Sequence, residues 1–165
     1  GSPLVIGEQM LLPQRQAAEP AEQPRTLWPW LLAGAITAIV ILVLARRMPR
    51  TLAGFAFAFW ALCGSLGLVL AFAWIGTEHR ALWANRNLLL LNPLCLLLLP
   101  AAWALLRGRV PAAPVRWLLI VVAACAALAC IPLWLQTLPQ RNGQWIALLL
   151  PMHAAFAWVW ARRKA

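Results

Sequence analysis

The sequence predicts an all-α membrane protein, a bundle of five transmembrane helices. Of its 165 residues, 64% are hydrophobic and only 11% are charged, and the mean hydropathy is +0.77, whereas soluble domains carry roughly 25% charged residues. A soluble domain of this size leaves about 30% of its chain surface in water, which is too much for so apolar a composition. Long apolar runs also alternate with short basic clusters along the chain. These observations exclude a soluble domain, a disordered chain and a disulfide scaffold.

The first 26 residues are not expected to belong to the bundle. Residues 1–13 have the pattern of a strand, a turn and a second short strand, which is too short to be stable alone, so we interpret them as the tail of an upstream extracytoplasmic domain. The chain begins with Gly1 and Ser2 rather than Met, and no basic region precedes its first apolar run, so no secretory signal is predicted. Residues 14–26 are polar and contain Pro20 and Pro24, which is the composition of a linker.

Residues 27–165 are predicted to form the transmembrane domain. Its apolar segments lie at about 27–45, 52–75, 88–106, 115–135 and 145–160. A helix that crosses a hydrocarbon core of ~30 Å needs about 20 residues, and the fifth segment reaches that length if Gln144 and Ala161 extend it. Each segment must be helical, because lipid cannot satisfy backbone N–H and C=O groups. Pro93, Pro100 and Pro151 should each kink a helix or free a carbonyl.

The basic residues predict the orientation of the bundle. One side would carry nine of the 14 Lys and Arg residues: Arg46, Arg47, Arg50, Arg107, Arg109, Arg116, Arg162, Arg163 and Lys164. The positive-inside rule places this side in the cytoplasm, so the N-terminus lies outside and the C-terminus inside. Ten of the 11 tryptophans fall near predicted helix ends, at the headgroup level that indole rings prefer, and only Trp60 lies well inside a span. We therefore predict a multi-pass membrane protein whose N-terminus lies outside and whose C-terminus lies in the cytoplasm.

The overall charge and the cysteines point to no other partner or cofactor. The net charge is +10, but the basic residues form no stripe between aromatic stacking platforms, so we predict no nucleic-acid partner. Cys63, Cys95, Cys125 and Cys130 all lie inside apolar runs without neighbouring ligand-type residues, so we interpret them as packing residues and predict no metal site and no cofactor. The chain has no Asp and no Tyr, which excludes a Ser-His-Asp triad and a paired-aspartate site.

One polar segment stands out between the second and third spans. It runs from Thr77, Glu78 and His79 through Asn85 and Asn87 to Asn92 and Pro93. One interpretation makes His79 a general acid or base at the water–lipid boundary, oriented by Glu78 or an Asn. If the third helix begins near Asn85, then Asn85 and Asn92 share one helical face. The alternative is a polar interfacial loop whose asparagines cap the third helix.

A second histidine lies near the middle of the fifth span. Ionisable residues at this depth are costly and often functional, so His153 is a candidate substrate-binding residue. The alternative is a neutral His153 that hydrogen-bonds to a carbonyl freed by a proline. Before this span, residues 136–144 form a second polar loop, which includes Asn142 and is placed to close over the first.

The Thr-Glu-His and Asn-x-Asn-Leu-Leu-x-x-Asn-Pro-Leu pattern (Thr77 to His79, Asn85 to Leu94) resembles the membrane part of Lnb-like proteins. These are bacterial enzymes related to the lipoprotein intramolecular transacylase, with an extracytoplasmic domain followed by five membrane helices. The resemblance implies a protein of the bacterial cytoplasmic (inner) membrane. It also implies acyl transfer on a diacylglyceryl lipoprotein, with membrane lipid and the upstream domain of the same polypeptide as partners. It carries over Thr77, Glu78, His79, Asn85, Asn87 and Asn92 as site residues. It also implies that this chain alone is inactive, because the extracytoplasmic domain holds much of the site.

Two other classes of function remain open. A non-catalytic membrane anchor would only orient the upstream domain, and its five spans would be exchangeable for an unrelated anchor. A small transporter or channel would need several buried charges along a path, whereas only His153 lies deep in a span.

Overall fold

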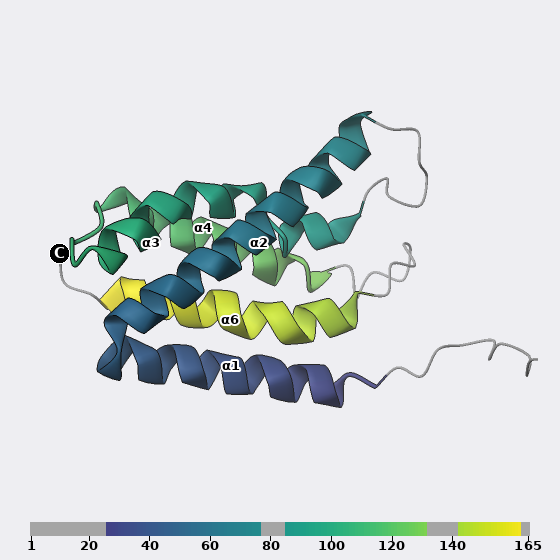
Figure 1. Ribbon diagram of the computed structural model, residues 1–165. Helices are drawn as coiled ribbons and strands as arrows, with labels where there is room; N and C mark the ends of the chain where they lie inside the picture. The colour runs from purple at the N-terminus through teal and green to yellow at the C-terminus, as the bar shows by residue number, and fades with distance from the viewer. Residues whose placement is uncertain (1–25, 77–84, 132–141, 163–165) are drawn as a thin grey trace, which may run out of the picture.

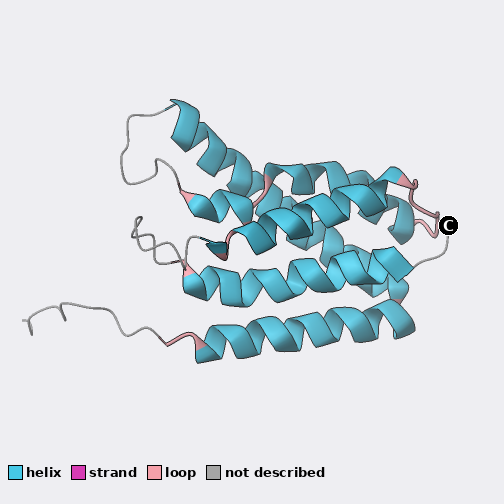
Figure 2. Cartoon of the chain, turned by 180° about the vertical axis from the view of Figure 1, so that it is seen from behind, coloured by secondary structure: helices cyan, strands magenta, loops and turns pink. Residues whose placement is uncertain are grey.

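The computed structural model describes residues 26–76, 85–131 and 142–162, and all of the secondary structure in these ranges is helical. The elements are α1 (Trp28–Arg47), α2 (Pro49–Gly76), the 3₁₀ segments η1 (Arg86–Leu89) and η2 (Pro93–Leu98), α3 (Leu99–Leu106), α4 (Pro114–Leu128) and α6 (Gly143–Arg162). They form one bundle with α6 in its middle, flanked by α1 on one side and by α4 on the other (Figures 1 and 2). The all-helical class predicted from composition is confirmed.

Four segments are long and apolar enough to cross a membrane: Trp28–Arg47, Pro49–Gly76, Arg86–Leu106 and Gly143–Arg162. The remaining apolar helix, α4, has 15 residues and ends at Leu128, short of the limit near residue 135 that the sequence suggested. The predicted length of that span therefore rests partly on residues 132–135, outside the described ranges. In α2, 28 residues give a length of about 42 Å, and this helix crosses the bundle diagonally (Figure 1).

Helix α1 packs along α6 at close range because Gly34 has no side chain. A Cβ at Gly34 would collide with the carbonyl oxygen of Ala147 and lie 2.7 Å from that of Leu148. Pro151, four residues after Ala147, has no N–H to donate to the Ala147 carbonyl, so the backbone of α1 covers a carbonyl that α6 leaves free. Near the start of both helices the rings of Trp30 and Trp145 lie 6.4 Å apart.

Aromatic side chains form the core between α2 and α6. The ring of Phe156 lies 5.2 Å from Trp60 and 5.4 Å from Phe59, and Trp60 is 5.5 Å from Trp160. Trp60 and Phe156 are fully buried. Trp160, which the sequence placed near a helix end, is only 5% exposed and belongs to this core. Trp160 is buried because it packs against Trp60 of α2, and a hydropathy pattern does not reveal such a partner.

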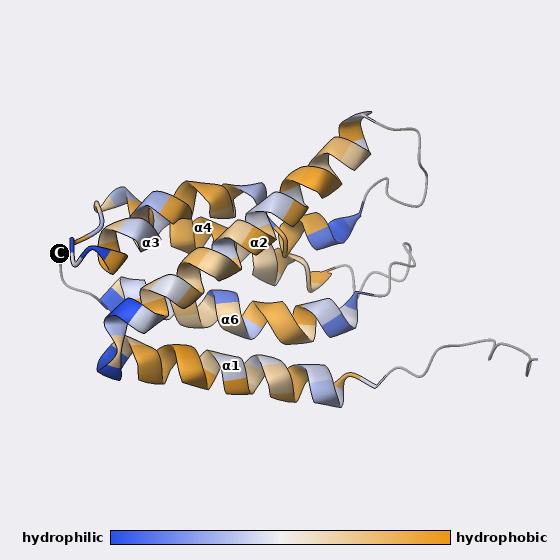
Figure 3. Ribbon diagram, in the orientation of Figure 1, coloured by the Kyte–Doolittle hydropathy of each residue, from blue (hydrophilic) through white to orange (hydrophobic). Residues whose placement is uncertain are grey.

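The outer surface between the two ends of the bundle is apolar, as lipid requires. Hydrophilic residues gather at both ends, and hydrophobic ones cover the middle (Figure 3). Large apolar side chains such as Ile39, Leu62 and Val69 are more than half exposed. At one end, which we call the Arg-rich end, lie seven of the eight described arginines: Arg46, Arg47, Arg50, Arg107, Arg109, Arg116 and Arg162. The opposite end, which we call the amide end, carries Asn85, Asn87 and Asn142.

Candidate functional site

The third span starts as two short 3₁₀ segments instead of a regular helix. Asn85 precedes η1, and its Oδ1 accepts a hydrogen bond of 3.0 Å from the backbone N–H of Asn87. Asn92 precedes η2, and its Oδ1 accepts one of 3.0 Å from the N–H of Leu94. Each asparagine therefore caps its own segment. The placement of both on one face of a regular helix was wrong, because the extended backbone of Asn92 and the ring of Pro93 interrupt the helix between them.

The interruption leaves the carbonyl of Leu90 without a helical donor. Pro93, three residues on, has no N–H, and the N–H of Leu94, four residues on, is already bonded to Asn92. His153 of α6 supplies the missing donor, because its Nε2 lies 3.0 Å from the Leu90 oxygen. A carbonyl only accepts, so this Nε2 carries a proton, and in the neutral ring Nδ1 is the basic nitrogen. The structure thus contains the bond that we considered as the alternative for His153.

His153 is deeply buried between α6, α2 and the interrupted span. Its side chain is 2% exposed, and that of Asn92 is 6% exposed. The imidazole also contacts the ring of Phe59, with centroids 5.1 Å apart and planes inclined by 57°. Leu90, to which it is bonded, is fully buried. A polar cluster of His153, Asn92 and the Leu90 carbonyl therefore sits inside the bundle and is hydrogen-bonded within it.

Two glycines of α2 make room for this irregular backbone. A Cβ at Gly67 would collide with the carbonyl oxygen of Leu91 and lie 2.8 Å from the nitrogen of Pro93. A Cβ at Gly64 would lie 2.9 Å from the nitrogen of Leu96. Ser65, the small polar residue between these two glycines, is exposed and makes no such approach. The close approach is made by Gly64 and Gly67, which lie on the buried face with Trp60 and Cys63.

The amide end holds buried polar atoms that the described residues do not satisfy. Asn142 immediately precedes α6, and its backbone oxygen accepts a hydrogen bond of 3.0 Å from Ile146. Its side chain is only 1% exposed, yet neither Nδ2 nor Oδ1 has a hydrogen-bond partner. The Oδ1 of Asn87 in η1 is buried without a partner as well. Because buried polar groups are nearly always paired in native proteins, such atoms mark places where a water or a ligand group is expected.

The predicted site residues differ in what the structure says of them. Thr77, Glu78 and His79 lie outside the described residues, so their proposed roles stay predictions. The structure places Asn92 and His153 in the buried cluster at the interruption of the third span. At the amide end, Asn85 immediately precedes η1 and Asn87 lies within it. Sequence reasoning placed Asn142 only in a polar loop. The signal for its burial was its position directly ahead of Gly143 and the apolar run of α6.

The described residues contain no group of three His, Cys, Asp or Glu side chains that could hold a metal ion. Cys63 and Cys95 are buried, and Cys125 and Cys130 are partly buried; all four are free thiols.

These features define a multi-pass helical membrane domain with an interrupted third span. The family model of the Lnb transmembrane domain matches residues 21–165. Because this match covers most of the chain, the chain belongs to the Lnb transmembrane domain family, as the Thr-Glu-His and Asn-Pro pattern suggested. No match was found among the curated proteins or the solved structures with which the chain was compared.

Proposed function

We propose that this chain is the membrane part of an acyl-transfer enzyme that acts on lipoproteins at the outer face of the bacterial cytoplasmic membrane. The observation that carries the proposal is the interrupted third span in a member of the Lnb transmembrane family. Acyl transfer between lipid-linked groups needs its reacting atoms at the headgroup level, with the acyl chains held among helices. Amide N–H groups at that level are suited to hold an ester carbonyl as negative charge develops on its oxygen.

Within this proposal, the role of each polar residue depends on whether its side chain already makes a hydrogen bond within the protein. His79 is the general acid or base and Glu78 orients it, with Thr77 beside them. The side-chain oxygens of Asn85 and Asn92 and the Nε2 of His153 are engaged in holding the third span, so these three are positioning residues that fix the backbone ahead of α3. Asn87 and Asn142 have buried side-chain polar atoms without a hydrogen-bond partner among the described residues. Within the described part of the chain, these two residues are therefore the proposed substrate contacts.

The test is mass spectrometry of the N-terminal peptide of a lipoprotein from cells that carry the full-length protein. His79→Ala is expected to abolish acyl transfer to the N-terminal amino group, while Arg80→Gln, at the next residue, serves as the matched control. Unchanged transfer by the His79→Ala protein, at equal amounts in the membrane, would remove His79 from the mechanism.

The proposal requires the amide end to face the non-cytoplasmic side. Its support is the distribution of charge, since seven of the eight described arginines lie at the opposite end. A single cysteine at position 81, in a background without the four native cysteines, can be labelled with a membrane-impermeant reagent in intact spheroplasts. Labelling before permeabilisation is expected. A thiol that reacts only afterwards would invert the orientation and end the enzymatic proposal.

A non-catalytic anchor is the second candidate, favoured by the fact that Asn85, Asn92 and His153 all have structural hydrogen bonds. The two candidates separate when the five spans are replaced by an unrelated membrane anchor. If the membrane domain is only an anchor, the upstream domain should keep its activity in the fusion protein. If the membrane domain forms part of the active site, activity should be lost even though the fusion protein is inserted and stable.

A further inference from the structure

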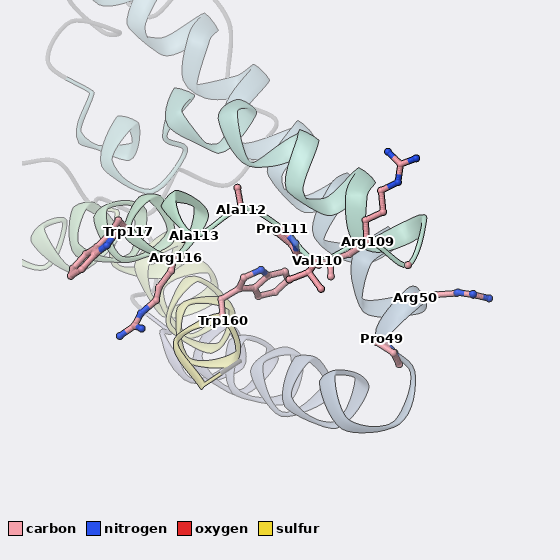
Figure 4. A pocket seen from close by; sticks show the side chains of 12 residues that line it. Pro49, Arg50, Arg109, Val110, Pro111, Ala112, Ala113, Arg116, Trp117 and Trp160 are labelled. Carbon is pink, nitrogen blue, oxygen red and sulfur yellow. The ribbon is translucent and has the colours of Figure 1, made fainter. Parts of the chain in front are cut away.

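A cavity of about 550 Å³ opens at the Arg-rich end of the bundle, far from the amide end. It lies among the start of α2, the connection from α3 to α4, the start of α4 and the end of α6 (Figure 4). Its volume is within the range of ~300–1,000 Å³ that is typical of small-molecule sites. It is much larger than a single ordered water or a bare phosphate ion would need.

The electrostatic potential around this cavity is positive. Arg50, Arg109 and Arg116 line it, and the described residues include no Asp or Glu that could neutralise them. The helices α2 and α4 both begin beside it, and the positive end of a helix dipole adds to the potential. An anion is therefore the favoured occupant.

The middle of the cavity is apolar, in contrast to its rim. Figure 4 shows the indole of Trp160 facing Val110 and Pro111 in the centre, with the three arginine side chains around the edge and their guanidinium groups turned outward. Trp160 is 5% exposed and continues into the aromatic core of α2 and α6. A fully polar anion would leave the apolar floor, formed by Trp160, Val110 and Pro111, exposed to water. An amphiphile would cover this floor with its apolar part and place its charged group near the arginines of the rim.

We infer that this cavity binds the phosphate group and adjoining glycerol of an anionic phospholipid. The positive rim would attract the phosphate to the mouth of the cavity, and the side chains of Arg50, Arg109 and Arg116, which point outward in this structure, would turn toward it to pair their N–H donors with its oxygens. The first carbons of the acyl chains would lie on Trp160 and Val110. Basic pockets between transmembrane helices are a known physical solution to headgroup binding. This site is separate from the proposed acyl-transfer function and does not depend on it.

Native mass spectrometry of the full-length protein in detergent tests the inference, with phosphatidylglycerol or the zwitterionic phosphatidylcholine added. The wild-type protein is expected to retain one phosphatidylglycerol in preference to phosphatidylcholine. The triple variant Arg50→Gln/Arg109→Gln/Arg116→Gln should weaken that retention at least about tenfold, because each basic residue near an anionic headgroup contributes several-fold. The matched control Arg46→Gln/Arg47→Gln/Arg162→Gln removes the same charge at the same end but outside the cavity, and should retain the lipid. Equal losses in the two triple variants would overturn the site.

A second variant separates the cavity from its charge. Ala112 lines the cavity and is exposed, so Ala112→Trp fills the space without changing any charge, while Ala124→Trp on the exposed face of α4 is the control. Loss of phosphatidylglycerol only in the Ala112→Trp protein supports the inference, and full retention overturns it. A competition with soluble glycerol 3-phosphate distinguishes the two sources of the phosphate. Displacement of the lipid at equal concentration would show that the apolar floor contributes nothing and would overturn the phospholipid assignment.

Discussion

The hydrogen bond from His153 to Leu90 is the contact by which the interrupted third span can be tested most directly. The change His153→Phe keeps a planar ring against Phe59, whose centroid lies 5.1 Å from the imidazole, but removes the donor that lies 3.0 Å from the Leu90 oxygen. No other donor replaces it, because Pro93 has no N–H and the N–H of Leu94 is bonded to Asn92. The Leu90 carbonyl is then buried without a partner.

The expected cost follows from that orphaned carbonyl. Leaving a buried acceptor unsatisfied costs about 1–3 kcal/mol in proteins generally. Hydrogen bonds between membrane helices average only ~0.6 kcal/mol, because the unfolded state in the membrane also finds partners. We therefore expect His153→Phe to lower the free energy of unfolding by about 1–2 kcal/mol, between these bounds.

The assay is reversible unfolding of the purified protein in bicelles. His153→Gln is the matched variant, because its Nε2–H reaches nearly as far as the imidazole Nε2 and can still donate to Leu90. It loses the ring contact with Phe59, which is worth about 0.5–1.5 kcal/mol at most. If His153→Phe is as stable as the wild type, the hydrogen bond does not hold the interrupted span.

Three further changes test the same region and its neighbour. Gly67→Val should sharply reduce the folded yield in size-exclusion chromatography, because a Cβ there collides with the backbone of Leu91. Gly54→Val, the control, should be tolerated because the nearest atom to its Cβ is Leu106 Cδ2 at 3.9 Å. Equal yields of the two variants would contradict the close approach of α2 to the third span. Asn92→Ala should lower the free energy of unfolding by about 1 kcal/mol through loss of the cap on Leu94, and Asn92→Ser, which keeps a side-chain oxygen, should recover most of it. Asn142→Leu should raise the unfolding free energy by about 1 kcal/mol, since it removes a buried amide without partners among the described residues. It should also reduce acyl transfer by the full-length protein if that amide contacts substrate, whereas a destabilised variant would mean that the amide has a structural partner.

Much of the fold could be predicted because it depends on composition and on the lengths and spacing of the apolar runs. The apolar runs locate α1, α2 and α6 to within a few residues, since lipid leaves a hydrophobic backbone no alternative to a helix. The break in the third span is partly visible in Asn92 and Pro93, but its extent is not. Whether a helix recovers after a proline depends on what the neighbouring helices offer, and here Gly67 and His153 are 26 and 60 residues away from Pro93 in sequence.

The candidate site was less accessible to sequence reasoning. Residue type alone identified Asn92 and His153 as unusual at their depth, but not that they serve one backbone interruption. Asn142 was hidden among the polar residues of a loop, because burial at a helix start depends on packing by other segments. Trp160 was assigned to the headgroup level because it lies near a predicted helix end, and that position does not reveal that its side chain is buried against Trp60.

The interruption itself bears on which function the domain has. The stretch from Leu88 to Leu99 is rich in leucine, a strong helix former, so a regular helix would be the favoured outcome if Asn92 and Pro93 were ordinary apolar residues. Instead the chain keeps a break that needs a glycine opposite it on α2 and a buried histidine donor on α6. An anchor gains nothing from that requirement, since any uninterrupted apolar helix would span the bilayer. A site that must hold Asn85 and Asn87 at a fixed place beside the lipid surface does gain, because the capped 3₁₀ segments fix the backbone where a fraying helix end would not.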